Sequence, residues 1–82
     1  MNIIIYTKTG CPWCKGAMDL LHGKNIPFEE REVRGNEQFY KELVDKSGQD
    51  KTPTLDIDGE ILADLDADQI AAHLKKKGIA GF

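Results

Sequence analysis

The sequence predicts a single α/β domain over residues 1–82, with the element order β-α-β-α-β-β-α and helices on both faces of a four-stranded mixed sheet. Three observations favour this fold class. An apolar, β-branched run is followed by a helical pattern and a second strand, which form a parallel βαβ unit. A second helix comes next, and the chain then returns as a hairpin and a last helix. Finally, 82 residues is the length of one domain.

The first strand is predicted at residues 3–6, because a continuous run of isoleucines and a tyrosine suits a central strand buried on both faces. A helix is predicted from Cys11, since the residues that follow have the i, i+3, i+4, i+7 spacing of one apolar stripe. The stripe consists of Cys14, Ala17, Met18 and Leu21. Pro12 suits the first turn, where its missing N–H costs nothing. Gly23 is the expected C-cap of this helix.

The segment 24–35 is predicted to contain a strand at 28–33, near the sheet edge because its middle is charged. Asn36 is the expected cap of a second helix that runs to about Ser47. Gly48 is expected to end that helix. The inner face of the helix is formed by Phe39, Leu43 and Val44.

The last third of the chain predicts a hairpin and a helix. Residues 54–57 alternate in polarity, as in a half-buried strand, with Leu55 and Ile57 facing inward. The two-residue turn that hairpins prefer, Asp58-Gly59, precedes a return strand at 60–62. Asp66 and Gln69 have the spacing of a capping box, which predicts the start of the last helix. Its apolar stripe is Ala67, Ile70, Ala71 and Leu74, and Gly78 is expected to stop it after the lysines at 75–77.

Composition and charge exclude several classes of function. The net charge of −3 provides no electrostatic footprint for nucleic acid. No apolar run approaches the length of about 20 residues that a membrane span needs. Met1-Asn2 leads straight into the first strand without the regions of a signal peptide, so a cytoplasmic protein is expected. It is also expected to be a monomer. In that reducing compartment a single pair of cysteines is seldom a structural staple.

Both cysteines lie in Cys11-Pro12-Trp13-Cys14, at the first strand-to-helix junction of the βαβ unit, which is the thioredoxin-like redox signal. The free N–H groups and dipole of the helix start favour a thiolate on Cys11. Lys8 and Lys15 add positive charge nearby. Cys14 falls on the apolar stripe, so it is expected to be buried and protonated. Cys11 is therefore the predicted nucleophile, and Cys14 the residue that resolves the mixed disulfide.

Two other interpretations of the cysteines remain. They could be structural thiols, although nothing then accounts for their spacing and position. They could bind zinc, but only His22 and His73 could join them, from the far ends of two helices, and a zinc site needs about four ligands. No metal is therefore expected.

The chain resembles the glutaredoxin family of the thioredoxin-fold superfamily. The matching residues are Tyr6-Thr7-Lys8, Cys11-Pro12-Trp13-Cys14, Thr52-Pro53 and Asp58-Gly59 with its hairpin, and the element order matches over essentially the whole chain. The family usually has tyrosine at the position of Trp13. The resemblance implies a thiol–disulfide oxidoreductase that reduces protein disulfides and glutathione mixed disulfides. Glutathione would be its electron donor, and no cofactor would be tightly bound.

The resemblance also implies binding roles for residues outside the cysteine pair. Lys8 would hold one carboxylate of glutathione, the Thr52 backbone the cysteinyl part, and the start of the last helix the other carboxylate. Pro53 would be a cis-proline facing the disulfide, although spacing alone is equally compatible with a trans proline that opens a strand. Trp13 would contact the ligand or only shield the helix start. The expected substrate- and glutathione-binding residues are Lys8, Pro12, Trp13, Thr52, Pro53, Asp66 and Ala67.

The chain departs from the family pattern in the glutathione site. Ala63-Asp64 replaces a Gly-Gly turn, and Tyr40 replaces a basic or amide residue on the second helix, with Lys51 as a compensating cation. An alternative is therefore the same chemistry with a flavin reductase or another low-molecular-weight thiol as donor. Ribonucleotide reductase is a candidate client in either case. A third hypothesis, a dimer that holds an iron–sulfur cluster through Cys11 and external thiols, is disfavoured by the few ligands available.

Overall fold

The computed structural model of the chain describes residues 2–63 and 65–79. These residues form four strands and three helices in the predicted order β-α-β-α-β-β-α, which confirms the expected fold class. The elements are β1 (Ile3–Thr7), α1 (Pro12–Gly23), β2 (Glu29–Glu32), α2 (Glu37–Ser47), β3 (Thr54–Ile57), β4 (Glu60–Ala63) and α3 (Ala67–Lys76). No helix within these two ranges has the length and apolar character needed to cross a membrane.

The four strands form one mixed sheet in the order β2-β1-β3-β4. β1 and β2 are parallel, with Ile4 opposite Glu29 and Thr7 opposite Glu32. The pairs β1–β3 and β3–β4 are antiparallel. A parallel pair needs a crossover connection, and α1 is that crossover. β2 lies at an edge, as its charged sequence predicts, and β1 is central.

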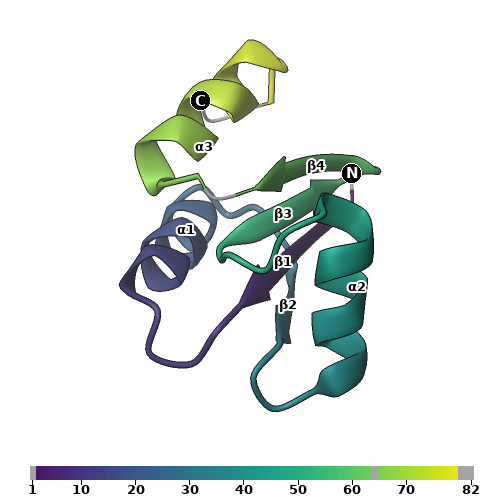
Figure 1. The fold of residues 1–82 in the computed structure, drawn as a ribbon. Helices are drawn as coiled ribbons and strands as arrows, with labels where there is room; N and C mark the ends of the chain where they lie inside the picture. The colour runs from purple at the N-terminus through teal and green to yellow at the C-terminus, as the bar shows by residue number, and fades with distance from the viewer. Residues whose placement is uncertain (1, 64, 80–82) are drawn as a thin grey trace.

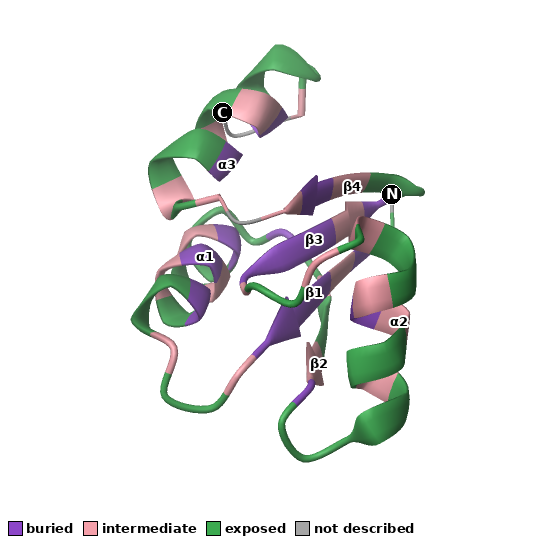
Figure 2. Ribbon diagram, viewed as in Figure 1, coloured by how far each residue is buried: buried purple, intermediate pink, exposed green. Residues whose placement is uncertain are grey.

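Helices cover both faces of the sheet: α1 and α3 lie on one face and α2 on the other (Figure 1). Buried residues lie along the strands and on parts of α1 and α3 (Figure 2). Among the described residues, the core between the sheet and these two helices is the larger of two. Its buried residues are Ile3, Ile5, Ala17, Leu21, Ile26, Leu55, Ile57, Leu62, Ile70 and Leu74. The core under α2 contains Tyr6, Val33 and Leu43. Because side chains alternate along β1, the strand contributes to both cores.

Two details of the prediction are wrong. β3 was expected to be half-buried, but Thr54 is only 1% exposed, because β3 is a second central strand with helices over both faces. Gly23 is the last residue of α1, and the C-cap is Lys24, with a φ of −100°. The left-handed residue of this turn is Asn25, with a φ of 56°, so the chain reverses two residues later than expected.

The other predicted caps and turns are confirmed. The Asn36 side chain accepts the Phe39 N–H at 3.1 Å, and Gly48 ends α2 in the left-handed conformation, with a φ of 70°. Asp58 and Gly59 have φ values of 51° and 93°, as a tight two-residue hairpin turn requires. These signals were readable because each acts within a few residues of chain.

Candidate active site around Cys11 and Cys14

Cys11 lies between β1 and α1, where it caps the helix. Its Sγ accepts the Cys14 N–H at 3.2 Å. Its own N–H donates to the Lys8 carbonyl at 3.1 Å, which closes the loop after β1. Gly10 has a φ of 83° in this loop, a conformation that favours glycine. The two cysteines form a disulfide with their Cα atoms 5.3 Å apart, in the usual range for such a bond.

The two sulfurs of the disulfide differ in environment. Cys11 is half-buried at the helix start, whereas Cys14 lies one turn inside α1 and is only 1% exposed. An incoming thiol or disulfide can therefore approach Cys11 but not Cys14. Free N–H groups and the helix dipole act on Cys11, so they stabilise negative charge on the sulfur that is accessible. Lys15, by contrast, forms an ion pair with Asp19 at 3.1 Å on the surface of α1.

The segment before β3 lies next to Cys11. The Thr52–Pro53 peptide bond is cis, as the resemblance implies, so the trans alternative is wrong. The Thr52 hydroxyl donates to Cys11 Sγ at 3.6 Å, and the Thr52 carbonyl oxygen lies 3.8 Å from the same sulfur. Pro53 itself is fully buried. The structure thus brings Thr52 and Pro53 to the disulfide from a position about forty residues away in the chain.

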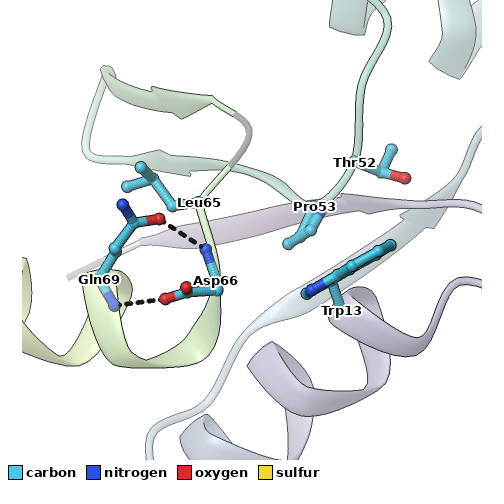
Figure 3. A pocket seen from close by; sticks show the side chains of 6 residues that line it. All are labelled: Trp13, Thr52, Pro53, Leu65, Asp66 and Gln69. Carbon is cyan, nitrogen blue, oxygen red and sulfur yellow. Dashed lines mark hydrogen bonds between the residues drawn. The ribbon is translucent and has the colours of Figure 1, made fainter.

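A pocket of about 230 Å³ opens beside this segment and extends to the start of α3 (Figure 3). Its lining residues are Trp13, Thr52, Pro53, Leu65, Asp66 and Gln69. We call it the α3 pocket. Trp13 is 64% exposed, so its indole ring leaves a large face open to a ligand and contributes little to the core. Ala67, the other predicted residue of this helix start, does not line the pocket and instead lies near Gly16 of α1.

The start of α3 is closed by its own capping box. Asp66 Oδ1 accepts the Gln69 N–H at 2.8 Å, and the Asp66 N–H donates to Gln69 Oε1 at 3.0 Å (Figure 3). The predicted capping box is therefore confirmed. Its consequence is that two backbone N–H groups that could receive a ligand carboxylate, those of Asp66 and Gln69, already have partners within the protein.

A second pocket, of about 370 Å³, lies beside Cys11 and Trp13, and we call it the cationic pocket. It is lined by Lys8, Gly10, Cys11, Pro12, Trp13, Arg34, Lys51 and Thr52. The structure thus brings together Lys8, Pro12, Trp13 and Thr52, which were predicted to bind substrate. Arg34 was missed by sequence reasoning, since it lies in the turn before α2 and belongs to no motif. Only its positive charge could have pointed to it.

Arg34 is held in this pocket by a small hydrogen-bond network around Glu32. The Glu32 carboxylate accepts the backbone N–H groups of Arg34 at 3.1 Å and Gly35 at 2.9 Å, and the Thr9 hydroxyl at 3.2 Å. Burial would raise the pKa of Glu32, but these hydrogen bonds outweigh it and lower the pKa below its ordinary value. Arg34 Nη1 donates to the Thr9 carbonyl at 3.0 Å. The turn after β2 is therefore tied to the loop that carries the cysteines.

The chain departs from the family pattern at Tyr40 and at Ala63-Asp64. Tyr40 is 41% exposed, and its hydroxyl donates to Asp50 at 3.2 Å, which raises the pKa of Tyr40. It lines a neighbouring pocket of about 510 Å³ together with Lys8 and Arg34. Ala63 ends β4, while the predicted departure at Asp64 lies outside the described residues.

The two histidines considered as zinc ligands have other contacts. His22 packs edge-on against Phe28, with ring centroids 4.9 Å apart, and His73 pairs with Glu60. Within residues 2–63 and 65–79, no group of three His, Cys, Asp or Glu side chains is placed to hold a metal ion.

Comparison with known sequences points to one family. The family model of glutaredoxin matches residues 3–62. Glutaredoxin 3 of Escherichia coli strain K12 is 35% identical over 65 residues, which cover 79% of this chain and 78% of that protein. A glutaredoxin-like 8.6 kDa protein encoded in the rubredoxin operon of Clostridium pasteurianum is 32% identical over 74 residues, or 90% and 99% of the two chains.

Solved structures agree with this match. The thioredoxin-like protein BC3987 superposes with a TM-score of 0.79 and 28% identity, over 87% of this chain and 97% of that one. Glutaredoxin from Brucella melitensis superposes with a TM-score of 0.69 and 29% identity, over 95% and 82% of the chains. The thioredoxin-like fold, the Cys11–Cys14 pair and the family match lead to one conclusion. The chain belongs to the glutaredoxin family and is a thiol–disulfide oxidoreductase.

Proposed function

We propose that the chain is a glutathione-dependent dithiol reductase of protein disulfides and glutathione mixed disulfides. The observation that carries the proposal is the position of Cys11. It caps α1, is half-buried, and lies beside Thr52 and the cationic pocket that contains Lys8. The proposal includes a monomer of one domain, residues 1–82, that works in the cytoplasm without a tightly bound cofactor. Ribonucleotide reductase is a candidate client.

The reaction begins with the reduced cysteine pair. The Cys11 thiolate attacks one sulfur of a client disulfide, the client S–S bond breaks, and the leaving thiolate takes up a proton. Cys14 then loses its proton and attacks Cys11 Sγ in the mixed disulfide, which releases the second client thiol. The client has gained two electrons, and the protein is left with the Cys11–Cys14 disulfide seen in the structure.

Two molecules of glutathione restore the dithiol. The first thiolate attacks Cys11 Sγ and frees Cys14, which takes up a proton. The second glutathione thiolate attacks the sulfur of the bound glutathione, so that glutathione disulfide leaves and Cys11 returns to the thiolate. Atoms and electrons balance, because two thiols become one disulfide while one disulfide becomes two thiols.

In this proposal the α3 pocket and the cationic pocket, which share Trp13 and Thr52, hold one glutathione. The Thr52 backbone pairs with its cysteinyl part, Trp13 covers one side, and Lys8 in the cationic pocket attracts its glycyl carboxylate. The γ-glutamyl part lies in the α3 pocket near Asp66. Pro12 and Pro53 shape the walls next to the sulfur, and Ala67 contributes through its backbone at the start of α3.

A second candidate is the same chemistry with another electron donor, either a flavin reductase or a different low-molecular-weight thiol. One observation favours it. The Gln69 side chain occupies the Asp66 N–H, so a ligand carboxylate at the start of α3 has to displace it or do without that contact.

Turnover of a glutathione mixed disulfide, coupled to glutathione reductase and NADPH, tests the proposal. We expect turnover by the unmodified chain and by Cys14→Ser, since a glutathione mixed disulfide needs only Cys11. Cys14→Ser should lose the reduction of protein disulfides, and Cys11→Ser should lose both activities. No turnover at millimolar glutathione, with intact reduction by a flavin reductase or another thiol, would contradict the proposal and support the second candidate.

A further inference from the structure

We propose that Arg34 determines specificity for thiol ligands that carry a carboxylate, and that it binds the glycyl carboxylate of glutathione together with Lys8. The inference rests on the proposed function and deepens it. It concerns a residue in the turn between β2 and α2, which lies outside the CxxC motif and outside the positions by which the chain resembles its family.

The first argument is that hydrogen bonds hold both the backbone and the side chain of Arg34 in place beside Cys11. Its backbone is held by Glu32, and its Nη1 donates to the Thr9 carbonyl two residues before Cys11. A guanidinium group has five N–H donors in a planar fork, so this contact orients the group and leaves donors for a carboxylate. Arg34 thus loses less conformational freedom on binding than a surface arginine without such a contact.

The second argument is the charge of the cationic pocket. Three cations, Lys8, Arg34 and Lys51, line the space beside Cys11 in a chain whose net charge is −3. None of the described residues that line this pocket carries a carboxylate. Glu30 and Glu32 line a different pocket, which also includes Cys11, Lys8 and Lys15. Glu37 lines the pocket that contains Tyr40. A local excess of positive charge next to a reactive sulfur attracts an anionic thiol.

The third argument concerns the position of Tyr40. Its phenol cannot supply the charge that a basic residue on α2 would supply, and its hydroxyl donates to Asp50. Arg34 lines the same pocket as Tyr40 and also reaches the cationic pocket, so it can supply that charge from a different element. Arg34 and Lys8 are the two cations that line both pockets. A carboxylate placed between them would form charge-assisted hydrogen bonds.

Two matched substrates test the inference: a peptide mixed disulfide of glutathione, and the same molecule with the glycyl carboxylate esterified. The reduced chain attacks each in a single turnover, and release of the peptide thiol is followed by chromatography. We expect the acid to react about tenfold faster than the ester in the unmodified chain, as for one charge-assisted contact near the surface. The preference should decline with added salt.

Arg34→Gln should reduce this preference several-fold, and Arg34→Lys should retain most of it, because the charge is kept. Lys75→Gln makes the same change of net charge on the last turn of α3 and should leave the preference unchanged. Thermal unfolding of each variant shows whether the fold is kept. An unchanged preference in Arg34→Gln, an equal loss of rate on acid and ester, or a preference that salt does not affect would overturn the inference.

The outcomes for the two proposals are separable. If the coupled assay shows no glutathione turnover but the acid-to-ester preference exists and depends on Arg34, the role of Arg34 stands and glutathione is not the natural donor. If glutathione turnover is normal and the acid-to-ester preference is the same in Arg34→Gln as in the unmodified chain, only the inference about Arg34 is wrong.

Discussion

Three residues of separation give the two cysteines different chemistry. Cys11 is a helix cap with access to solvent and to the Thr52 hydroxyl, while Cys14 is buried on the inner face of α1. The backbone N–H of Cys14 is one of the donors in the first helical turn that have no partner within the helix, and it points at the sulfur of Cys11. One helix turn therefore separates an accessible, charge-stabilised sulfur from a shielded one.

Gln69 offers a test of the α3 pocket. Its side chain occupies the Asp66 N–H, which is one of the groups proposed to receive a glutathione carboxylate. Gln69→Ala removes this competitor, so the KM for the glutathione mixed disulfide should fall about two- to threefold. The same change breaks the capping box and should lower the free energy of unfolding by about 0.5–1 kcal/mol.

Steady-state kinetics and urea unfolding of Gln69→Ala measure the two effects separately. Gln38→Ala, the same change at an exposed position of α2 that lines neither pocket, controls for general effects of surface substitution. A KM that rises in Gln69→Ala would show that the Gln69 side chain binds the ligand rather than competes with it.

Helix α2 is joined to the sheet by polar groups as well as by Leu43. The Tyr6 hydroxyl is buried under the helix, where it donates to Glu42 at 3.0 Å and accepts from Lys46 at 2.8 Å. Lys46 also pairs with Asp56 of β3 at 2.8 Å. No buried side-chain nitrogen or oxygen of the described residues is without a hydrogen-bond partner. The network therefore fixes α2 against β1 and β3 at no cost in unsatisfied polar groups.

Glu42 makes the stability of this network depend on pH. Burial would raise the pKa of Glu42, but hydrogen bonds from Tyr6 and Arg31 and the charges of Arg31 and Lys46 lower it. Its carboxylate therefore stabilises the fold above the ordinary pKa of about 4.3, and this contribution is lost as the pH falls through the lowered folded-state value. At pH 7, Glu42→Gln should reduce the free energy of unfolding by about 1 kcal/mol.

Urea unfolding at pH 7 and in acid measures this dependence. The difference between Glu42→Gln and the unmodified chain should shrink in acid, because the unmodified chain loses the same contribution there. Asp45→Asn, an exposed change on the same helix, should show a small difference at both pH values. A difference for Glu42→Gln that stays constant down to the acid end of the titration would contradict the account.

The whole molecule shows which features a sequence can specify. Most caps and turns were predictable, because Asn36, Asp58-Gly59 and the Asp66 capping box act on backbone groups two or three residues away. The C-cap expected at Gly23 was the exception. The burial of β3 on both faces was not predictable from the sequence, since it depends on α2 packing against the other face of the sheet. Local signals identify elements, whereas burial depends on which elements meet.

In the candidate site, too, local features were predictable from the sequence and features that depend on tertiary packing were not. The CxxC motif predicted the position and asymmetry of Cys11 and Cys14, while the cis bond before Pro53 came from resemblance and not from spacing. Arg34 could not be found, because only the folded chain brings the turn after β2 to the loop at Thr9. In the proposed function, the local CxxC motif sets the reaction, and residues distant in the sequence select the ligand.

The most direct test compares how fast each cysteine reacts with glutathione disulfide at neutral pH, using mass spectrometry on the reduced single variants. Cys14→Ser should form a glutathione adduct on Cys11 that a second glutathione removes. Cys11→Ser should react more slowly by on the order of a hundredfold, because access and thiolate stabilisation both favour Cys11. Comparable rates for the two variants, or an adduct on Cys11 that glutathione does not remove, would contradict the division of roles and the glutathione-dependent cycle.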